Sequence, residues 1–257
     1  MGASEIAPGI YVVGGPEISH AKDATVFLID FDGELVMVDC GAGRSVELIL
    51  DNIVDQGLDP ALISTLILTH AHIDHLGAAP ELRRRLGCRI LIHDLDAEAV
   101  EAGDPVRTAA DWYGIAFPPT PVDRRLKGEE ELLLFGGETL HCVHTPGHTP
   151  GSIAVWLDRG GKRVLFGQDI HGPFLPAFGS DIGQWCDSME KLLRLKADIL
   201  CEGHFGIFQP GDRVEAYIRS YLGQYGRSEG DGQGWGGYGK GRQEMFYHIQ
   251  GKGRSER

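Results

Sequence analysis

A short stretch of the chain, THAHIDHLG at residues 69–77, concentrates side chains that can bind a metal ion. It holds His70, His72, Asp74 and His75 directly after the apolar run 62–68. Imidazole nitrogens and carboxylate oxygens are ligands for zinc, iron and manganese, and a bound dication would relieve the crowding of these groups. The pattern therefore predicts a metal site. The H-x-H part would face one ion, and Asp74 and His75 would face a second position close by.

Three more candidate ligands follow later apolar segments. His148 lies in TPGHTPGS, Asp169 in LFGQD and His204 in LCEGHFG, each just after an expected strand and near a glycine. In α/β folds the chemistry gathers at the carboxyl ends of strands. We therefore expect these residues to meet the ligands of residues 69–77 at one edge of the fold. Surface histidines without a role would not repeat this placement.

The elements that must position these residues are strands and helices. Asp32-Gly33 is a hairpin signal between two strands, and Gly57 and Gly87 are expected to end helices. Strands are expected at 10–13, 24–30, 34–39, 62–68, 89–92, 139–144, 152–157, 163–166 and 198–201, and helices at 45–56, 75–86, 96–102, 184–196 and 212–225. Two β-rich halves with helices outside predict a layered α/β arrangement.

The composition argues against several classes of partner. The formal net charge is -13, and an acidic surface repels phosphate backbones, so nucleic acid is not an expected partner. Five cysteines without a CxxC pair predict buried thiols in a reducing compartment. No signal peptide is visible, and no apolar run approaches the roughly 18 residues of a membrane span. We therefore expect a cytoplasmic globular protein without a membrane partner.

The segments THAHIDH, TPGHTPGS, GQD and EGH, in this order, resemble the metallo-β-lactamase-fold hydrolase superfamily. The resemblance extends from Val38 to His204 and includes VDCG at residues 38–41. It implies a four-layer α/β fold, an αββα sandwich of two mixed β-sheets with helices on the outer faces and the metals at one edge. It also implies that Asp39, at the end of its strand, braces the metal loop.

The resemblance further implies how the ligands divide between two divalent ions. The first ion would be held by His70, His72 and His148, the second by Asp74, His75 and His204, and both would share Asp169 as a bridge. Zinc is the expected ion, with iron or manganese as alternatives.

A dinuclear site of this kind predicts a hydrolase. Two dications lower the pKa of a shared water, which becomes the nucleophile, and Asp74 is the candidate to pass a proton to the leaving group. A bridging Asp169 favours the thioesterase and lactonase-like branches of the superfamily over true β-lactamases, and glyoxalase II is the nearest thioesterase by motif. We therefore expect cleavage of an ester, thioester or lactone of a small, partly apolar substrate.

Two alternatives to a hydrolase stay open. One is an enzyme similar to the persulfide dioxygenases, in which His72, His148 and Asp169 hold a single iron. The other is a metal-binding protein without a catalytic role. Metal content, combined with activity measured with and without oxygen, would separate the three.

Residues around the ligands are candidates for contact with the substrate. Segment 103–130 is rich in proline and aromatic residues and is expected to cover the site, with Trp112 and Phe117 touching the substrate. Phe174 is expected to be a further pocket wall. His171 and His20 could reach the substrate or hydrogen-bond a metal ligand.

The chain is expected to divide near its C-terminus. Residues 1–225 would form the metal-binding domain. Residues 226–257 are too rich in glycine for a helix or a core and read as an extension, with a possible homo-oligomer contact through it.

Overall fold

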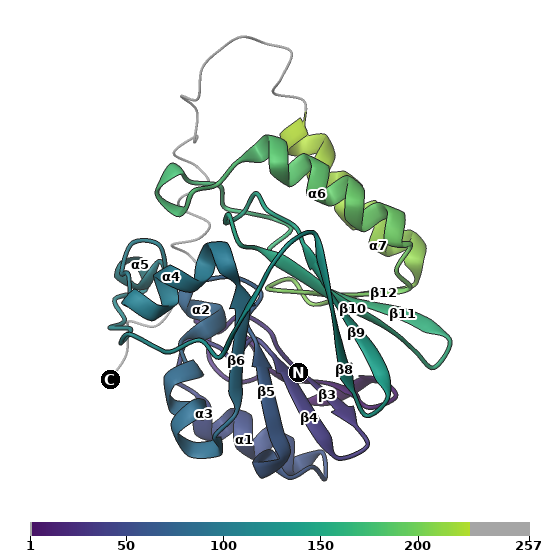
Figure 1. The fold of residues 1–257 in the computed structure, drawn as a ribbon. Coiled ribbons are helices and arrows are strands. Elements are labelled where there is room, and N and C mark those ends of the chain that lie inside the picture. The colour runs from purple at the N-terminus through teal and green to yellow at the C-terminus, as the bar shows by residue number, and fades with distance from the viewer. Residues whose placement is uncertain (1, 227–257) are drawn as a thin grey trace, which may run out of the picture. The chain divides into compact units, whose positions relative to one another are not determined.

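Two mixed β-sheets form the centre of the structure, a computed structural model that describes residues 2–226 (Figure 1). The first sheet has the order β1-β2-β3-β4-β5-β6-β7, antiparallel up to β4 and parallel from there on. Its strands are β1 (Ser4–Ala7), β2 (Ile10–Gly14), β3 (Val26–Phe31), β4 (Glu34–Val38), β5 (Ile63–Ile67), β6 (Arg89–His93) and β7 (Arg124–Leu126).

The second sheet has the order β13-β12-β11-β10-β9-β8. Strands β11 and β12 run parallel, and the other neighbours are antiparallel. Its strands are β8 (Glu130–Phe135), β9 (Glu138–His144), β10 (Ile153–Arg159), β11 (Lys162–Gln168), β12 (Ile199–Glu202) and β13 (Ile207–Phe208).

Helices cover the outer faces of both sheets (Figure 1). They are α1 (Val46–Asp55), α2 (Ile73–Leu76), α3 (Ala79–Leu86), α4 (Asp94–Ala102), α5 (Ala110–Tyr113), α6 (Ile182–Leu195) and α7 (Gly211–Tyr225), with 3-10 turns η1 (Pro60–Leu62) and η2 (Pro176–Phe178). No helix between residues 2 and 226 is both long enough and apolar enough to cross a membrane.

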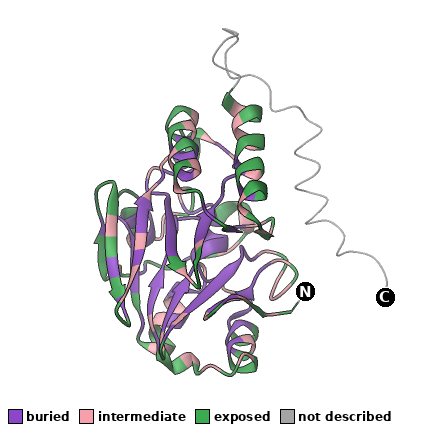
Figure 2. Ribbon diagram, turned by 90° about the vertical axis from the view of Figure 1, so that its right-hand side faces the viewer, coloured by how far each residue is buried: buried purple, intermediate pink, exposed green. Residues whose placement is uncertain are grey.

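Alternating side chains build the layers. In β5, Leu66 packs in the cluster beneath α1 and α3, and the next residue, Ile67, packs between the sheets. In β11, Leu165 packs with α6 and α7, and Phe166 packs between the sheets. Figure 2 shows the buried strands between helices whose outer sides are exposed. The expected αββα sandwich is thereby confirmed.

The helix expected at 75–86 is two helices. The main chain turns between α2 and α3, and Gly77 lies so close to Ala42 that a Cβ atom would stand 2.4 Å from the Ala42 carbonyl carbon. This turn keeps α2 short, so that Asp74 and His75 remain at the edge of the sheet and do not follow α3.

Four strands were not expected: β1, β7, β8 and β13. Strand β7 reads RRL and is dominated by charge, and β8 exposes Leu132 and Leu134 on an edge of its sheet, so neither shows a clear apolar alternation. Segment 103–130 accordingly contains α5 and β7 and is not a loop throughout. The glycine-rich extension after residue 226, and any subunit contact through it, lie outside the described residues.

Candidate metal centre

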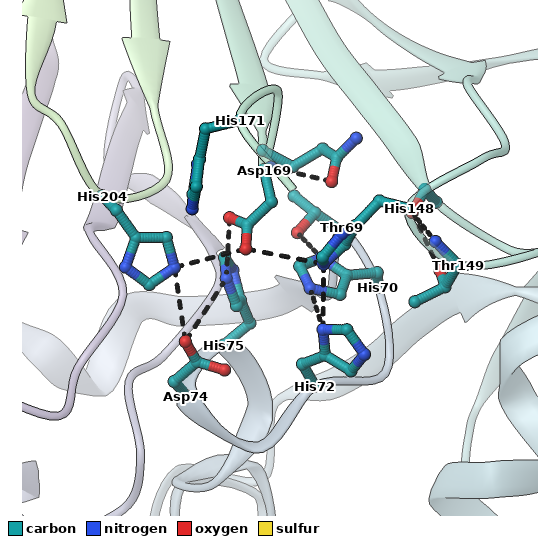
Figure 3. A network of polar contacts seen from close by, with 12 residues as sticks. Thr69, His70, His72, Asp74, His75, His148, Thr149, Asp169, His171 and His204 are labelled. Carbon is teal, nitrogen blue, oxygen red and sulfur yellow. Dashed lines mark hydrogen bonds and ion pairs between the residues drawn. The ribbon is translucent and has the colours of Figure 1, made fainter. Parts of the chain in front are cut away.

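Strand ends bring all seven expected ligands together at one edge of the two sheets (Figure 3). The loop after β5 carries His70 and His72, and α2 carries the next two ligands. His148 lies in the turn after β9, Asp169 directly follows β11, and His204 follows β12. Residues more than a hundred positions apart therefore meet because their strands end at the same edge.

The first group of donors surrounds His72. Its Nδ1 lies 3.1 Å from His70 Nε2 and 2.9 Å from His148 Nε2. His148 Nε2 also lies 3.5 Å from Asp169 Oδ2. Three imidazole nitrogens and one carboxylate oxygen thus converge on one point.

The second group shares the same carboxylate. Asp169 Oδ2 lies 3.3 Å from His204 Nε2, and Asp169 Oδ1 lies 3.1 Å from His75 Nε2. Asp74 Oδ2 completes the group at 3.3 Å from His204 Nε2 and 3.9 Å from His75 Nε2. Asp169 therefore contacts both groups and stands between them.

These residues fit two divalent ions. Ligands about 2.05 Å from a tetrahedral ion stand about 3.3 Å apart, which matches the spacing of both groups. His75 Nε2 and Asp169 Oδ1 are both buried and form an ion pair at 3.1 Å, but neither makes a well-directed hydrogen bond within residues 2–226. Buried polar atoms normally make one, and an ion bound between these two atoms would satisfy both.

Burial keeps the three histidines of the first group neutral. It lowers the pKa of His70 well below the ordinary value, and the neighbouring His75 and His72 act in the same direction. Burial likewise lowers the pKa of His72 to about 3 and that of His148 to about 4. A histidine ligand must offer an unprotonated nitrogen, so these side chains are ready to bind an ion.

The second group is ion-paired instead. Burial alone would lower the pKa of His75 and His204, but Asp169 and the adjacent carboxylates outweigh it. The pKa of His75 is raised well above its ordinary value and that of His204 to about 10. The same contacts lower the pKa of Asp74 and Asp169 against the effect of burial. An ion at this position must displace protons.

Asp39 braces the ligand loop through both of its oxygens. Its Oδ1 accepts from the Thr69 main-chain N–H at 2.8 Å, and its Oδ2 accepts from the Thr69 hydroxyl at 2.8 Å and from His75 Nδ1 at 2.7 Å. The Thr69 hydroxyl in turn lies 3.1 Å from His70 Nδ1. These contacts orient one ligand of each group, and they leave both Nε2 atoms facing the centre.

Asp96 was not recognised from the sequence. This buried carboxylate of α4 accepts hydrogen bonds from the Ala71 N–H at 2.9 Å, the Thr149 hydroxyl at 2.7 Å and the Gly151 N–H at 2.8 Å. It therefore ties the His70 loop to the His148 turn. The available signal was a charged residue on the apolar face of a helix, four positions before the buried Val100.

Tyr113 was expected only as an aromatic pocket wall, and its hydrogen bond to a ligand was not foreseen. Its hydroxyl donates to Asp74 Oδ2 at 2.8 Å, and its main-chain carbonyl accepts from Lys22 Nζ at 2.7 Å. Segment 103–130 thus reaches the site as expected, but through the tyrosine next to Trp112.

The aromatic candidates lie in different places. Trp112 is 61% exposed, and its ring lies 5.0 Å from that of Phe178, which lies 4.4 Å from the His72 ring. Phe117 is buried in the cluster beneath the helices of the first sheet. Phe174 is buried against the second sheet's helices, with its ring 6.3 Å from that of His148. Phe178 and the exposed Trp112 therefore extend from the ligand His72 to the surface, and Phe117 lies in the core.

The two remaining histidine candidates also differ. His171 Nδ1 lies 3.0 Å from Glu202 Oε1, and its ring lies 5.2 Å from that of His204. His20 lines a separate hollow at the start of α1, together with Arg44 and Glu47, and its Nδ1 accepts from the Lys22 N–H at 3.1 Å. Only His171 of this pair is close to the ligands.

The sequence matches a family model and several known proteins. The family model described as the metallo-beta-lactamase superfamily matches residues 22–204. The "Probable metallo-hydrolase YqgX" of Bacillus subtilis is 31% identical over 131 residues, 51% of this chain and 58% of that protein. The "Hydroxyacylglutathione hydrolase GloC" of Haemophilus influenzae is 32% identical over 133 residues, 50% of this chain and 58% of that protein. The chain thus spans less than two thirds of the length of either relative.

Solved structures share the fold. The subclass B3 metallo-beta-lactamase BJP-1 of Bradyrhizobium japonicum superposes with a TM-score of 0.73 and 24% identity, covering 88% of this chain and 92% of that one. At this identity the likeness concerns the fold alone, since one fold can carry different activities.

Proposed function

The chain belongs to the metallo-beta-lactamase superfamily, and we propose that it is a dinuclear metal-dependent hydrolase for an ester, thioester or lactone of a small, partly apolar substrate. The observation that carries this proposal is the position of Asp169. Its Oδ2 lies 3.5 Å from a donor of the first group and 3.3 Å from a donor of the second. A carboxylate so placed supports two ions sharing one ligand, with zinc as the first choice and iron or manganese as alternatives.

Bound dications would supply an activated water and would polarise the bond to be cleaved. The chain's own residues then hold and move the proton. Asp74 is ionised and accepts from the Tyr113 hydroxyl. Its carboxylate can take a proton and deliver it to the leaving group, and Tyr113 keeps it oriented. Asp39 and Asp96 hold the ligand loops in place.

The aromatic side chains beside the ligands favour a partly apolar substrate. Phe178 packs against His72, and the exposed Trp112 packs on Phe178. An apolar wall beside the ligands excludes water from one side and binds the hydrocarbon part of a substrate. The relative named hydroxyacylglutathione hydrolase supports a thioester within this class.

We further propose a small-molecule substrate in a reducing compartment, the cytoplasm. Cys40, Cys88, Cys142 and Cys201 are buried thiols that form no disulfide with one another. Buried thiols of this kind are typical of such a compartment.

Metal content and a substrate panel test the proposal together. Protein purified without added metal is stripped with a chelator, reloaded with zinc, manganese or iron, and assayed on thioesters, lactones, esters and phosphodiesters. We expect two ions per chain and hydrolysis of a carboxylic ester, thioester or lactone without oxygen. One ion at saturation, with turnover of a persulfide only in the presence of oxygen, would support the mononuclear iron alternative. Bound metal without any turnover would support a non-catalytic role.

A further inference from the structure

We propose that His171 is an additional ligand of the second metal position and that Glu202 orients it. This inference rests on the proposed function, because it assigns a further donor to the same dinuclear centre. His171 follows Asp169 by two residues, and Figure 3 shows its ring extending toward the space between Asp169 and His204. Donor atoms of these three residues all lie within 4.8 Å of one another.

Glu202 gives His171 the surroundings of a metal ligand. The carboxylate is fully buried at the end of β12, and its Oε1 accepts from His171 Nδ1 at 3.0 Å. Its Oε2 accepts from the main-chain N–H groups of His204 at 2.7 Å and of Phe205 at 2.8 Å. Glu202 therefore fixes His171 to the loop that carries His204. With the proton on Nδ1, the His171 Nε2 atom offers a lone pair.

The same arrangement serves an expected ligand in this structure. His75 donates from Nδ1 to the buried Asp39 and directs Nε2 toward Asp169. A carboxylate behind the ring, with the other nitrogen facing the ion, is the usual support of a metal-binding histidine. His171, in the turn that follows β11, repeats this support with Glu202.

The distance allows coordination after a small movement. Two nitrogens on opposite sides of one ion stand about 4.2 Å apart, so a shift of less than about 1 Å brings His171 into reach. The second position would then have five protein donors, since Asp74, His75, His204 and Asp169 already face it. A fifth donor suits an ion that accepts more than four ligands, such as manganese or iron.

Cobalt binding tests this assignment without relying on activity. The whole chain is stripped of metal and titrated with Co²⁺, whose visible absorption changes with the number of ligands, and affinities are measured by competition with a chelator. In His171→Ala we expect the first ion to bind as in wild type and the second to bind about 100-fold more weakly with an altered spectrum. In Glu202→Gln we expect a loss of about tenfold at the second position.

Two further variants control the experiment. His171→Asn keeps a hydrogen bond to Glu202 from an amide placed as Nδ1 is, but it lacks a donor at the Nε2 position, so it should lose the second ion as His171→Ala does, even if the alanine variant folds poorly. His141 also pairs with a glutamate, Glu130, at 2.8 Å but lies away from the centre, so His141→Ala should leave both affinities unchanged.

The outcomes separate this inference from the proposed function. If wild-type protein binds only one Co²⁺ at saturation, the dinuclear proposal itself is wrong. If wild type binds two ions and His171→Asn retains the affinity and spectrum of the second, His171 is not a ligand. Reduced turnover of that variant with unchanged metal binding would also overturn the assignment, because it would place His171 in contact with the substrate alone.

Discussion

Asp96→Asn tests whether one buried carboxylate holds the first metal position together. Asp96 Oδ2 accepts from the main chain between His70 and His72 and from the Thr149 hydroxyl. Its Oδ1 accepts from Gly151 in the turn that carries His148. All three partners of the carboxylate are donors, so an amide of the same shape must point one donor at another.

The cost follows from the number of contacts on each oxygen. The asparagine is least unfavourable with its NH₂ group at the Oδ1 position, where it loses one hydrogen bond and leaves the Gly151 N–H unsatisfied. A hydrogen bond to a charged group contributes about 1.5–3 kcal/mol, and an unsatisfied buried donor costs about 1–3 kcal/mol. Burial raises the pKa of Asp96 although its hydrogen bonds oppose this, so part of their energy offsets desolvation. We therefore expect a loss of about 2–3 kcal/mol in the free energy of unfolding.

Urea unfolding of metal-free protein measures this loss, and chelator competition measures the affinity for the first ion, which should fall about tenfold. Asp94→Asn is the matched control. Asp94 lies in the same first turn of α4, but it forms an exposed ion pair with Arg125, and exposed pairs of this kind add little to stability. If Asp96→Asn costs no more stability than Asp94→Asn and leaves the affinity unchanged, Asp96 does not hold the two loops.

Asp169→Ala removes the carboxylate shared by both groups. We expect the variant to lose the second ion and at least about 100-fold in activity, with an unchanged far-UV circular dichroism spectrum. Two bound ions and full turnover would contradict the role of Asp169 as a bridge. Trp112→Ala should raise KM with the metals still bound, whereas Phe117→Ala should lower the free energy of unfolding by about 3–5 kcal/mol at similar KM. The affinity for the second ion should fall by up to about 100-fold for each unit by which the pH is lowered. The pKa values of His75 and His204 are raised, so protons compete with the ion for both side chains. Equal pH dependence of both ions would refute this.

The ligand cluster could be predicted because its signals are local. Each expected ligand lies in the segment that follows an apolar strand, and parallel or neighbouring strands end at a common edge. The order of strands and helices predicted a layered α/β arrangement, and the αββα sandwich followed from the resemblance to the superfamily. The structure then brings the seven residues together with the spacing that two ions need.

The remaining parts of the site depend on contacts between distant segments. Asp96 accepts a hydrogen bond from Gly151, which lies 55 positions away in the sequence, and Tyr113 donates one to Asp74, which lies 39 positions away. No local pattern encodes such contacts. The same limit applies to Trp112 and Phe117, which lie five residues apart with one ring exposed and the other buried. The direction of a side chain in an irregular segment is set by packing and cannot be predicted from the residue type alone.

The two groups of ligands differ in protonation, and this difference predicts which of them binds an ion first. The first group offers neutral imidazoles, so an ion meets no competition from protons there. The second group is balanced by its own ion pairs, in which Asp169 is the carboxylate that most strongly holds protons on His75 and His204. If two ions bind as we propose, an ion in the first position would attract Asp169 and weaken its hold on those protons. Binding of the first ion would then release the ligands of the second, and the shared carboxylate would offset the repulsion between the two ions.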